Sequence, residues 1–319
     1  MIEVRDAGLY CEAGNFYIDP WAPVERAVIT HAHADHAHPG SQSYLTARAG
    51  EALLRARVGD AAPIQVAEYG ERIAMGEAIV SLHPAGHILG SAQIRIERGG
   101  EVWVFSGDYK LAPDPTCAPF EALRCHTFVT ESAFALPIYR WPAESEVAAS
   151  MLAWWQTNRE AGLASVLFAH PLGEAQRAIA MLGSADGAMH AHEAVERYSA
   201  IYRAQGIELR AMDVFAPGAL VVAPTLAIGS PWLKQFGAIS TAMASGWMRI
   251  RGTRRRRSLD RGFVLSDHAD WPALLAAIDA TQAETVLATG INRAALARWL
   301  EEHGRRAGVL ETRFEGGEE

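Results

Sequence analysis

The amino-acid sequence predicts a mixed α/β protein, and two observations carry this prediction. Short β-branched or aromatic runs bounded by Gly, Pro or charge recur through the first third, which is typical of strands joined by tight turns. From about residue 145 onward, strand-like runs alternate with helical patterns, which is typical of a parallel α/β unit. The chain has 319 residues, of which 50% are hydrophobic, so it can form one large domain or two closely associated ones.

The expected elements are these, in chain order. The first third holds strands Phe16–Ile18, Ala27–Thr30, Ala78–Leu82, Gln93–Glu97 and Val102–Phe105, and a helix from about Tyr44 to Arg57. The middle third holds helix Ser145–Arg159, strand Ser165–Ala169, and helices Glu174–Leu182 and Glu193–Arg203. The last third holds strand Gly262–Leu265, helix Trp271–Ile278, strand Thr285–Ala288, helix Arg293–His303 and strand Val309–Thr312. The terminal GGEE is expected to fray.

Composition excludes some classes of protein. The three cysteines form neither an even set nor a CxxC pair, which indicates a reducing cytoplasm and buried thiols. The longest apolar runs are strand-sized and the N-terminus lacks an apolar signal region, so we expect a cytoplasmic protein without a membrane span. The net charge of −8 argues against a nucleic-acid binder. However, seven arginines gather between Arg249 and Arg261 against one acid, Asp260, so the total hides a local positive patch.

The stretch THAHADHAHPG, residues 30–40, concentrates imidazoles and one carboxylate directly after an expected strand. Such groups are ligands for zinc, and also for manganese or iron. Alternation places His31 and His33 on one side, while the adjacent Asp35 and His36 can turn toward a second ion. The pattern therefore predicts a two-metal site; the alternatives are a histidine-rich surface loop or a single structural zinc.

Further ligands are expected at the ends of other strands. His87 lies among small residues and glycines, and Asp108 follows strand Val102–Phe105 after a glycine that permits a tight turn. A carboxylate at position 108 can bridge two ions. Asp19 ends another strand and is expected to orient a ligand or its loop. His83 lies inside a strand pattern and is expected in the core or in support of a ligand.

These residues resemble the metallo-β-lactamase superfamily, with its HxHxDH motif, a Gly-flanked histidine, and a Gly-Asp pair after a strand. The resemblance implies a four-layer αββα sandwich. It also implies that His31, His33 and His87 hold a first metal, that Asp35 and His36 hold a second, and that Asp108 bridges the two.

Two later motifs narrow the resemblance. Glu131 in VTESAFALPIYRW and His268 in FVLSDHADWPAL are similar to the acidic and histidine motifs of the β-CASP nucleases. The resemblance implies that His268, oriented by Glu131, protonates the leaving oxygen. It also implies a cap domain at 141–255, inserted between the metallo-β-lactamase segments 1–140 and 256–319. The alternatives are a helix-capping or surface carboxylate at Glu131 and a polar core histidine at His268.

Over nearly the whole chain, segments such as ASGWMRIRGTRRRR and DRGFVLSDHADWPALLAAI look like the bacterial ligase-associated DNA exonuclease group. That group implies an ATP-dependent DNA ligase and a repair helicase as associated proteins. The β-CASP proteins that act on RNA carry a late histidine before glycine, whereas VLATGINRAAL has Thr289 and Gly290 there. This departure favours DNA and leaves the second metal short of a ligand, so we expect that ion to be weakly held or partly occupied, with Thr289, Asn292 or water as its substitute ligand.

The sequence thus predicts a metal-dependent DNA nuclease, an exonuclease in DNA repair that uses two divalent ions, Zn or Mn, to activate water. Asp108, His268 and Glu131 are its expected catalytic residues. The expected phosphate contacts are Arg254, Arg255, Arg256, Arg257 and Lys110, the alternative for the arginines being a solvated charged loop. The alternative functions are an RNA-processing β-CASP ribonuclease, a small-molecule metallohydrolase of lactonase or thioesterase type, and a non-catalytic nucleic-acid-binding scaffold.

Overall fold

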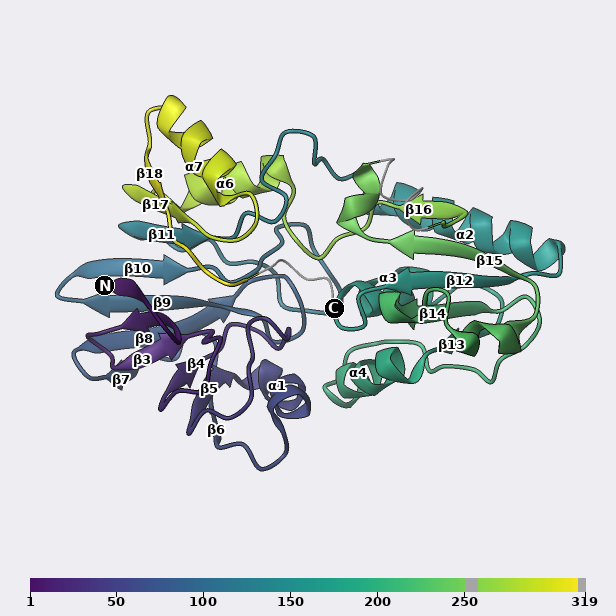
Figure 1. Cartoon of the computed structure of the whole chain (residues 1–319), viewed down its shortest axis with the longest axis horizontal. Coiled ribbons are helices and arrows are strands. Elements are labelled where there is room, and N and C mark those ends of the chain that lie inside the picture. The colour runs from purple at the N-terminus through teal and green to yellow at the C-terminus, as the bar shows by residue number, and fades with distance from the viewer. Residues whose placement is uncertain (251–257, 315–319) are drawn as a thin grey trace. The chain divides into compact units, whose positions relative to one another are not determined.

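The structure is a computed structural model that describes residues 1–250 and 258–314 (Figure 1). The chain divides into two compact units. Among the described residues, the first comprises Met1–Pro137 and His268–Phe314, and the second lies within Ile138–Asp267. β16 (Arg261–Phe263) pairs with β15 (Ile239–Ala244) in the sheet of the second unit, so the chain returns to the first unit only after this strand.

The first unit contains two sheets. The six-stranded sheet has the order β1-β2-β3-β4-β5-β6, antiparallel from β1 to β3 and parallel from β3 to β6. Its strands are β1 (Ile2–Arg5), β2 (Gly8–Cys11), β3 (Phe16–Ile18), β4 (Ala27–Val28), β5 (Tyr44–Ala47) and β6 (Ile64–Ala67).

The seven-stranded sheet has the order β18-β17-β11-β10-β9-β8-β7. Strands β7 to β10 pair antiparallel, and β10, β11, β17 and β18 pair parallel. Its strands are β7 (Ile73–Met75), β8 (Ala78–Pro84), β9 (Ala92–Arg98), β10 (Glu101–Phe105), β11 (Thr127–Thr130), β17 (Thr285–Ala288) and β18 (Arg306–Val309).

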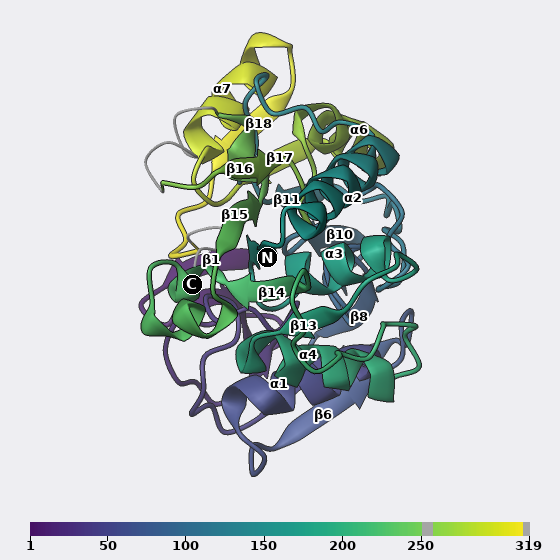
Figure 2. The same ribbon diagram turned by 90° about the vertical axis from the view of Figure 1, so that its right-hand side faces the viewer.

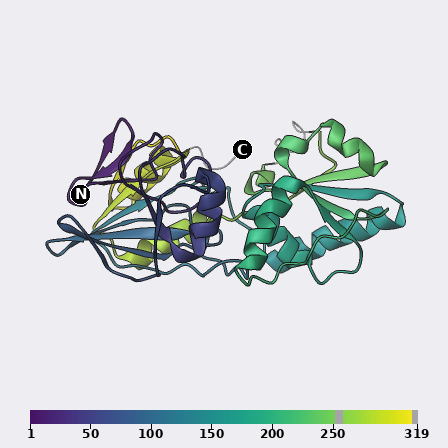
Figure 3. The same ribbon diagram turned by 90° about the horizontal axis from the view of Figure 1, so that it is seen from below.

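The main core of the first unit lies between these two sheets. Buried residues of the six-stranded sheet, such as Phe16 and Val28, form one cluster with residues of the seven-stranded sheet, such as Ile94 and Val129. On its other face the seven-stranded sheet packs against α6 (Trp271–Thr281) and α7 (Arg293–Glu302). The six-stranded sheet packs likewise against α1 (Glu51–Val58), the dark-blue helix in Figure 3. The first unit is therefore layered as helix, sheet, sheet, helix.

The second unit is built on a parallel five-stranded sheet of order β13-β14-β12-β15-β16 (Figure 2). Its other strands are β12 (Ala164–Ala169), β13 (Met189–Ala191) and β14 (Leu220–Pro224), and its helices are α2 (Glu144–Glu160), α3 (Glu174–Leu182) and α4 (Glu193–Ala204). Short 3₁₀ turns occur in the second unit at Thr225–Ala227, Pro231–Phe236 and Gly246–Arg249, and in the first unit at Arg48–Gly50. Strands alternating with helices explain the parallel pairing, because a parallel neighbour requires a crossover connection.

The prediction of a mixed α/β fold is confirmed, and most predicted elements lie within a few residues of the observed ones. Two predictions are wrong. The expected helix from Tyr44 begins as strand β5, because this segment pairs with both β4 and β6 in the buried sheet, and α1 starts only at Glu51. The last strand is β18 rather than Val309–Thr312, because Arg306 pairs opposite Thr285 of β17 at the sheet edge. No helix in the described part of the chain combines the length and apolar character needed to cross a bilayer.

Candidate metal centre

Most predicted site residues of the first unit lie in loops that follow strand ends. The loop after β4 carries His31, His33, Asp35 and His36; Asp19 follows β3, His87 follows β8, Asp108 follows β10 and Glu131 follows β11. All of these side chains are buried except that of Asp35, which is 23% exposed. The structure thus brings together side chains that are distant in sequence.

A first group consists of His31, His33, His87 and Asp108, whose candidate ligand atoms lie within 4.8 Å of one another. The Nε2 atom of His87 is 3.1 Å from Nδ1 of His33, and Nε2 of His31 is 3.5 Å from Oδ2 of Asp108. Ligands about 2 Å from a tetrahedral zinc ion are separated by about 3.3 Å. These distances therefore fit a single cation between the four side chains.

A second group surrounds His36. Its Nε2 atom lies 3.7 Å from Oδ2 of Asp35 and 3.4 Å from Oδ2 of Asp108. The same Asp108 oxygen is 3.5 Å from Nε2 of His31 in the first group. One carboxylate oxygen therefore faces both groups, as a bridging ligand would.

The unpaired polar atoms of the site also fit cations. His31 Nε2, His36 Nε2 and Asp35 Oδ2 are buried without a hydrogen-bond partner, although buried polar atoms are normally paired. The three atoms belong to the two groups and are all ligand atoms of the types that zinc and manganese accept. The first group therefore fits a divalent ion, and the atoms around His36 offer further ligands of the same kind.

Asp19 and Thr30 support the histidines from behind. Oδ1 of Asp19 accepts the Thr30 backbone N–H at 2.8 Å, and Oδ2 accepts the Thr30 hydroxyl at 2.6 Å. Oδ2 is also 2.8 Å from Nδ1 of His36. Because the Thr30 hydroxyl donates to Asp19, it can accept from Nδ1 of His31, 3.0 Å away. His31 and His36 can then each carry the ring hydrogen on Nδ1, which leaves Nε2 without a hydrogen and able to bind a metal.

The close packing of two loops depends on Gly107. Its φ is +56°, and a Cβ there would lie 2.7 Å from Cβ of Thr30. A glycine is therefore required both by the backbone conformation and by the approach of Asp108 to the histidine loop.

Electrostatics differ between the two groups. Burial, assisted by the neighbouring His36 and His87, holds the pKa of His31 well below its ordinary value. Burial has the same tendency at His36 but is outweighed by Asp35, Asp108 and Asp19, so the pKa of His36 lies well above the ordinary value. Burial raises the pKa of Asp108, but the nearby His36, His268 and His31 outweigh it and hold that pKa well below its usual range. The surroundings of His31 thus favour its neutral form, while those of His36 favour positive charge.

Glu131 and His268 form a buried pair beside the first group. Nδ1 of His268 lies 2.9 Å from Oε2 and 3.1 Å from Oε1 of Glu131. Oε1 also accepts the backbone N–H of Tyr109 at 2.9 Å, which fixes the carboxylate. The His268 ring is centred 4.7 Å from the His87 ring. The Glu131 carboxylate thus fixes the Nδ1 side of the His268 ring.

The other predicted residues have different surroundings. Lys110 is buried, with 3% of the residue exposed. Arg254, Arg255, Arg256 and Arg257 lie outside the described residues. The Thr289 hydroxyl donates to the Thr130 carbonyl, and the Asn292 amide donates to the Ala133 carbonyl, so both side chains brace loops of the first unit.

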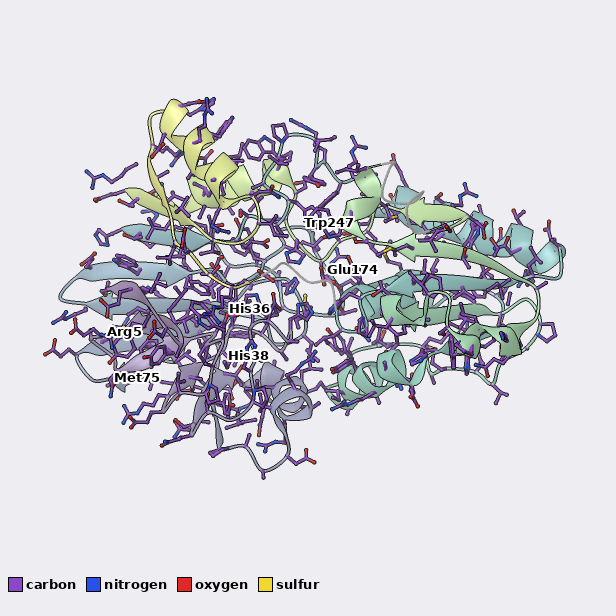
Figure 4. All side chains as sticks on the ribbon, in the orientation of Figure 1. Arg5, His36, His38, Met75, Glu174 and Trp247 are labelled. Carbon is purple, nitrogen blue, oxygen red and sulfur yellow. The ribbon has the colours of Figure 1, made fainter. Side chains whose placement is uncertain are left out.

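Two more histidines, His38 and His83, lie near the candidate ligands in the sequence. His38 follows His36 on the same loop, and both are labelled in Figure 4; within the described residues it joins none of the groups that could hold a metal. His83 contacts Ser81 and Glu121 instead of the metal groups.

The sequence did not identify Thr30, Tyr109 and Phe314 as residues that contact the side chains of the site. Thr30 and Tyr109 directly neighbour His31 and Asp108, and this adjacency was the available signal. Phe314, whose ring stacks on that of His36, carried no signal because its contact joins the two ends of the sequence.

Comparisons with known proteins complete the description. No protein-family model matches the chain. The chain is 29% identical over 311 residues to a protein from Opitutus terrae described as "Probable DNA ligase". The match covers 95% of this chain and 30% of that protein, so the chain spans less than a third of the relative's length. The chain also resembles the crystal structure of a protein of unknown function from Enterococcus faecalis V583, with a TM-score of 0.57 at 12% identity, over 91% of this chain and 80% of that one. At this identity the likeness shows a shared fold alone.

Proposed function

We propose that this chain is a metal-dependent nuclease that hydrolyses phosphodiester bonds in DNA. The observation that carries the proposal is the cluster of buried histidines in which one oxygen of Asp108 lies close to both His31 and His36. The Glu131–His268 pair beside them adds a proton donor. Within the proposal, the first unit is a metallo-β-lactamase fold and the second a β-CASP cap. The helix, sheet, sheet, helix layering and the inserted parallel sheet support these assignments.

DNA is proposed as the substrate on two grounds. The relative from Opitutus terrae is described as a probable DNA ligase, and this chain corresponds to only part of it. The place of a late histidine, which RNA-directed β-CASP nucleases carry, is taken by Thr289. We therefore propose an exonuclease in DNA repair, with an ATP-dependent DNA ligase and a repair helicase as associated proteins.

Divalent ions held by the two groups would neutralise the charge that develops on the phosphate and make water acidic enough to react near neutral pH. His31, His33 and His87 are the proposed ligands of one ion, and Asp35 and His36 those of the other. Asp108 contacts both groups through one oxygen.

The chain's own residues supply the remaining chemistry. Asp19 and Thr30 hold His36 and His31 with their Nε2 atoms toward the ions. The Glu131 carboxylate holds the hydrogen on Nδ1 of His268 and so orients the ring. The proton on Nε2 of His268 would pass to the sugar oxygen as the P–O bond breaks, which is general acid catalysis. The phosphate contacts of Arg254, Arg255, Arg256 and Arg257 belong to the same proposal.

The test is digestion of DNA and RNA of matched sequence, each labelled at the 5′ or the 3′ end, with Mn²⁺, Zn²⁺ or Mg²⁺ added to metal-stripped protein. We expect shortening of DNA, dependence on the metal, and slower or no cleavage of RNA. His36→Gln should lose activity, whereas His38→Gln, a substitution on the same loop outside the metal groups, should retain it.

Three results would contradict the proposal in different ways. Intact DNA with every metal excludes a nuclease acting on DNA. Preferential cleavage of RNA indicates the RNA-processing alternative. Activity on lactone or thioester substrates without cleavage of DNA indicates a small-molecule hydrolase.

A further inference from the structure

The C-terminal segment Leu310–Phe314 emerges at the sheet edge that carries the metal centre. Strand β18 runs parallel to β17 and β11, so its carboxyl end lies at the same edge as the loops that bear Glu131 and Thr289. The backbone N–H of Leu310 donates to the Ala288 carbonyl at 2.9 Å, which extends this pairing beyond β18.

The segment is held by aromatic contacts. Phe314 is 7% exposed and belongs to the core cluster between the two sheets. Its ring is centred 6.1 Å from that of Trp21 at 69° and 6.3 Å from that of Phe105 at 64°, both edge-to-face arrangements. The Arg313 guanidinium lies 5.6 Å from the Trp21 ring centre. Phe314 therefore occupies a defined position between the two sheets of the first unit.

The third ring contact of Phe314 is made with a candidate ligand. The rings of Phe314 and His36 are centred 4.4 Å apart with an interplanar angle of 16°, a stacked arrangement. An imidazole ring that is protonated, or bound to a metal cation, is attracted to the face of an aromatic ring. The stack is therefore favourable when His36 faces a cation through its edge.

The stack supplies a restraint that the hydrogen bond of His36 lacks. Asp19 fixes Nδ1 of His36 at 2.8 Å, but one hydrogen bond leaves the ring free to tilt about the bonded atom. The Phe314 ring lies flat against the imidazole and so fixes its plane. With both restraints, Nε2 is directed toward Asp35 and Asp108, 3.7 and 3.4 Å away.

We propose that Phe314 is a positioning residue for His36 and that Leu310–Phe314 is therefore a working part of the second metal site. The inference rests on the metal centre of the proposed function. The sequence has Thr289 near the place where a late histidine would serve as a further ligand. Because the second site then has few protein ligands, its metal affinity depends strongly on how His36 is oriented.

The test compares Phe314→Leu with Phe314→Tyr, which keeps the ring, and with Phe16→Leu, which removes another buried ring of the same core cluster. Mn²⁺ binding to the metal-stripped full chain is measured by calorimetry. For Phe314→Leu we expect the weaker binding step to lose about tenfold in affinity, the lower end of the effect of groups that orient ligands, with the tighter step unchanged. Phe314→Tyr and Phe16→Leu should both bind as the wild type does.

A second measurement needs neither activity nor metal. In ¹H–¹⁵N spectra of histidine-labelled protein, the His36 signals are assigned with His36→Gln. They should shift in Phe314→Leu, because the ring current of the stacked partner is lost, and stay in place in Phe16→Leu.

The proposal is overturned if Phe314→Leu retains both the weaker Mn²⁺ step and the His36 signals, or if Phe16→Leu weakens that step as much. If the wild type binds Mn²⁺ but leaves DNA intact, the nuclease proposal fails while these measurements still decide the role of Phe314. If the wild type binds no Mn²⁺ at all, both proposals fail.

Discussion

Asp19→Asn isolates the charge that supports both groups of ligands. Asp19 has φ +40°, a conformation that asparagine tolerates better than most residues, so the substitution preserves size and backbone. The carboxylate is fully buried and accepts from Thr30 N–H, the Thr30 hydroxyl and His36 Nδ1 at 2.8, 2.6 and 2.8 Å. An asparagine amide keeps one acceptor oxygen, but its NH₂ group replaces the other. One or two of the three donors would then face an N–H group instead of an acceptor.

The magnitude follows from these contacts. Removing a hydrogen bond to a charged group costs about 1.5–3 kcal/mol. Burial raises the pKa of Asp19 against the opposing effects of His36 and Thr30, which shows that a carboxylate charge is itself costly here and that its removal offsets part of the loss. We therefore expect the metal-stripped variant to lose about 2 kcal/mol of unfolding free energy at most. Metal affinity should fall by about 10- to 100-fold, most at the ion that His36 faces.

The assay combines urea unfolding of metal-stripped protein with calorimetric titration of Mn²⁺ and Zn²⁺. Asp60→Asn, at an exposed carboxylate, is the matched control and should change neither quantity. Wild-type affinity for both ions in Asp19→Asn would refute the reasoning that Asp19 orients the ligands.

Three further predictions follow from the same structure. Gly107→Ala should cost about 1–3 kcal/mol more in urea unfolding than Gly99→Ala, since both have similar positive φ but only a Cβ at 107 meets Thr30; equal losses would contradict the close approach. Burial raises the pKa of the Cys125 thiol to about 11, so only about one thiol in a thousand is ionised at pH 8. Its reaction with a disulfide reagent should therefore be slow, and the rate should rise about tenfold per pH unit up to that pKa. Half-buried Cys117 should react first. Glu131→Gln should lower single-turnover DNA cleavage by about 10²–10⁴-fold with unchanged metal affinity; weakened metal binding would instead indicate that Glu131 is a ligand.

Much of the site could be predicted because each residue type is unusual where it stands. His31 and His33 directly follow a strand, and Asp108 follows another after a glycine, so the sheet itself brings them to one edge. The pairing of Glu131 with His268 could not come from spacing, since 137 positions separate them; it was implied by a resemblance to a family.

What the sequence concealed was the support of the ligands. Thr30 is a common residue in a strand, and its role appears only when Asp19 and His31 lie on either side of its hydroxyl. Phe314 follows the last strand near the C-terminus and reads as an ordinary hydrophobic residue. Local pattern also failed at Tyr44, because pairing with two neighbouring strands overrode the helical alternation of small and leucine residues.

The proposed metal centre is tested most directly by locating the bound cations. Anomalous diffraction from crystals of Mn²⁺-loaded protein, recorded at the manganese edge, locates them without reference to activity. We predict one peak among His31, His33 and His87, a second and weaker peak beside Asp35 and His36, and Asp108 between the two. The absence of any peak within this cluster in metal-saturated crystals would contradict this prediction.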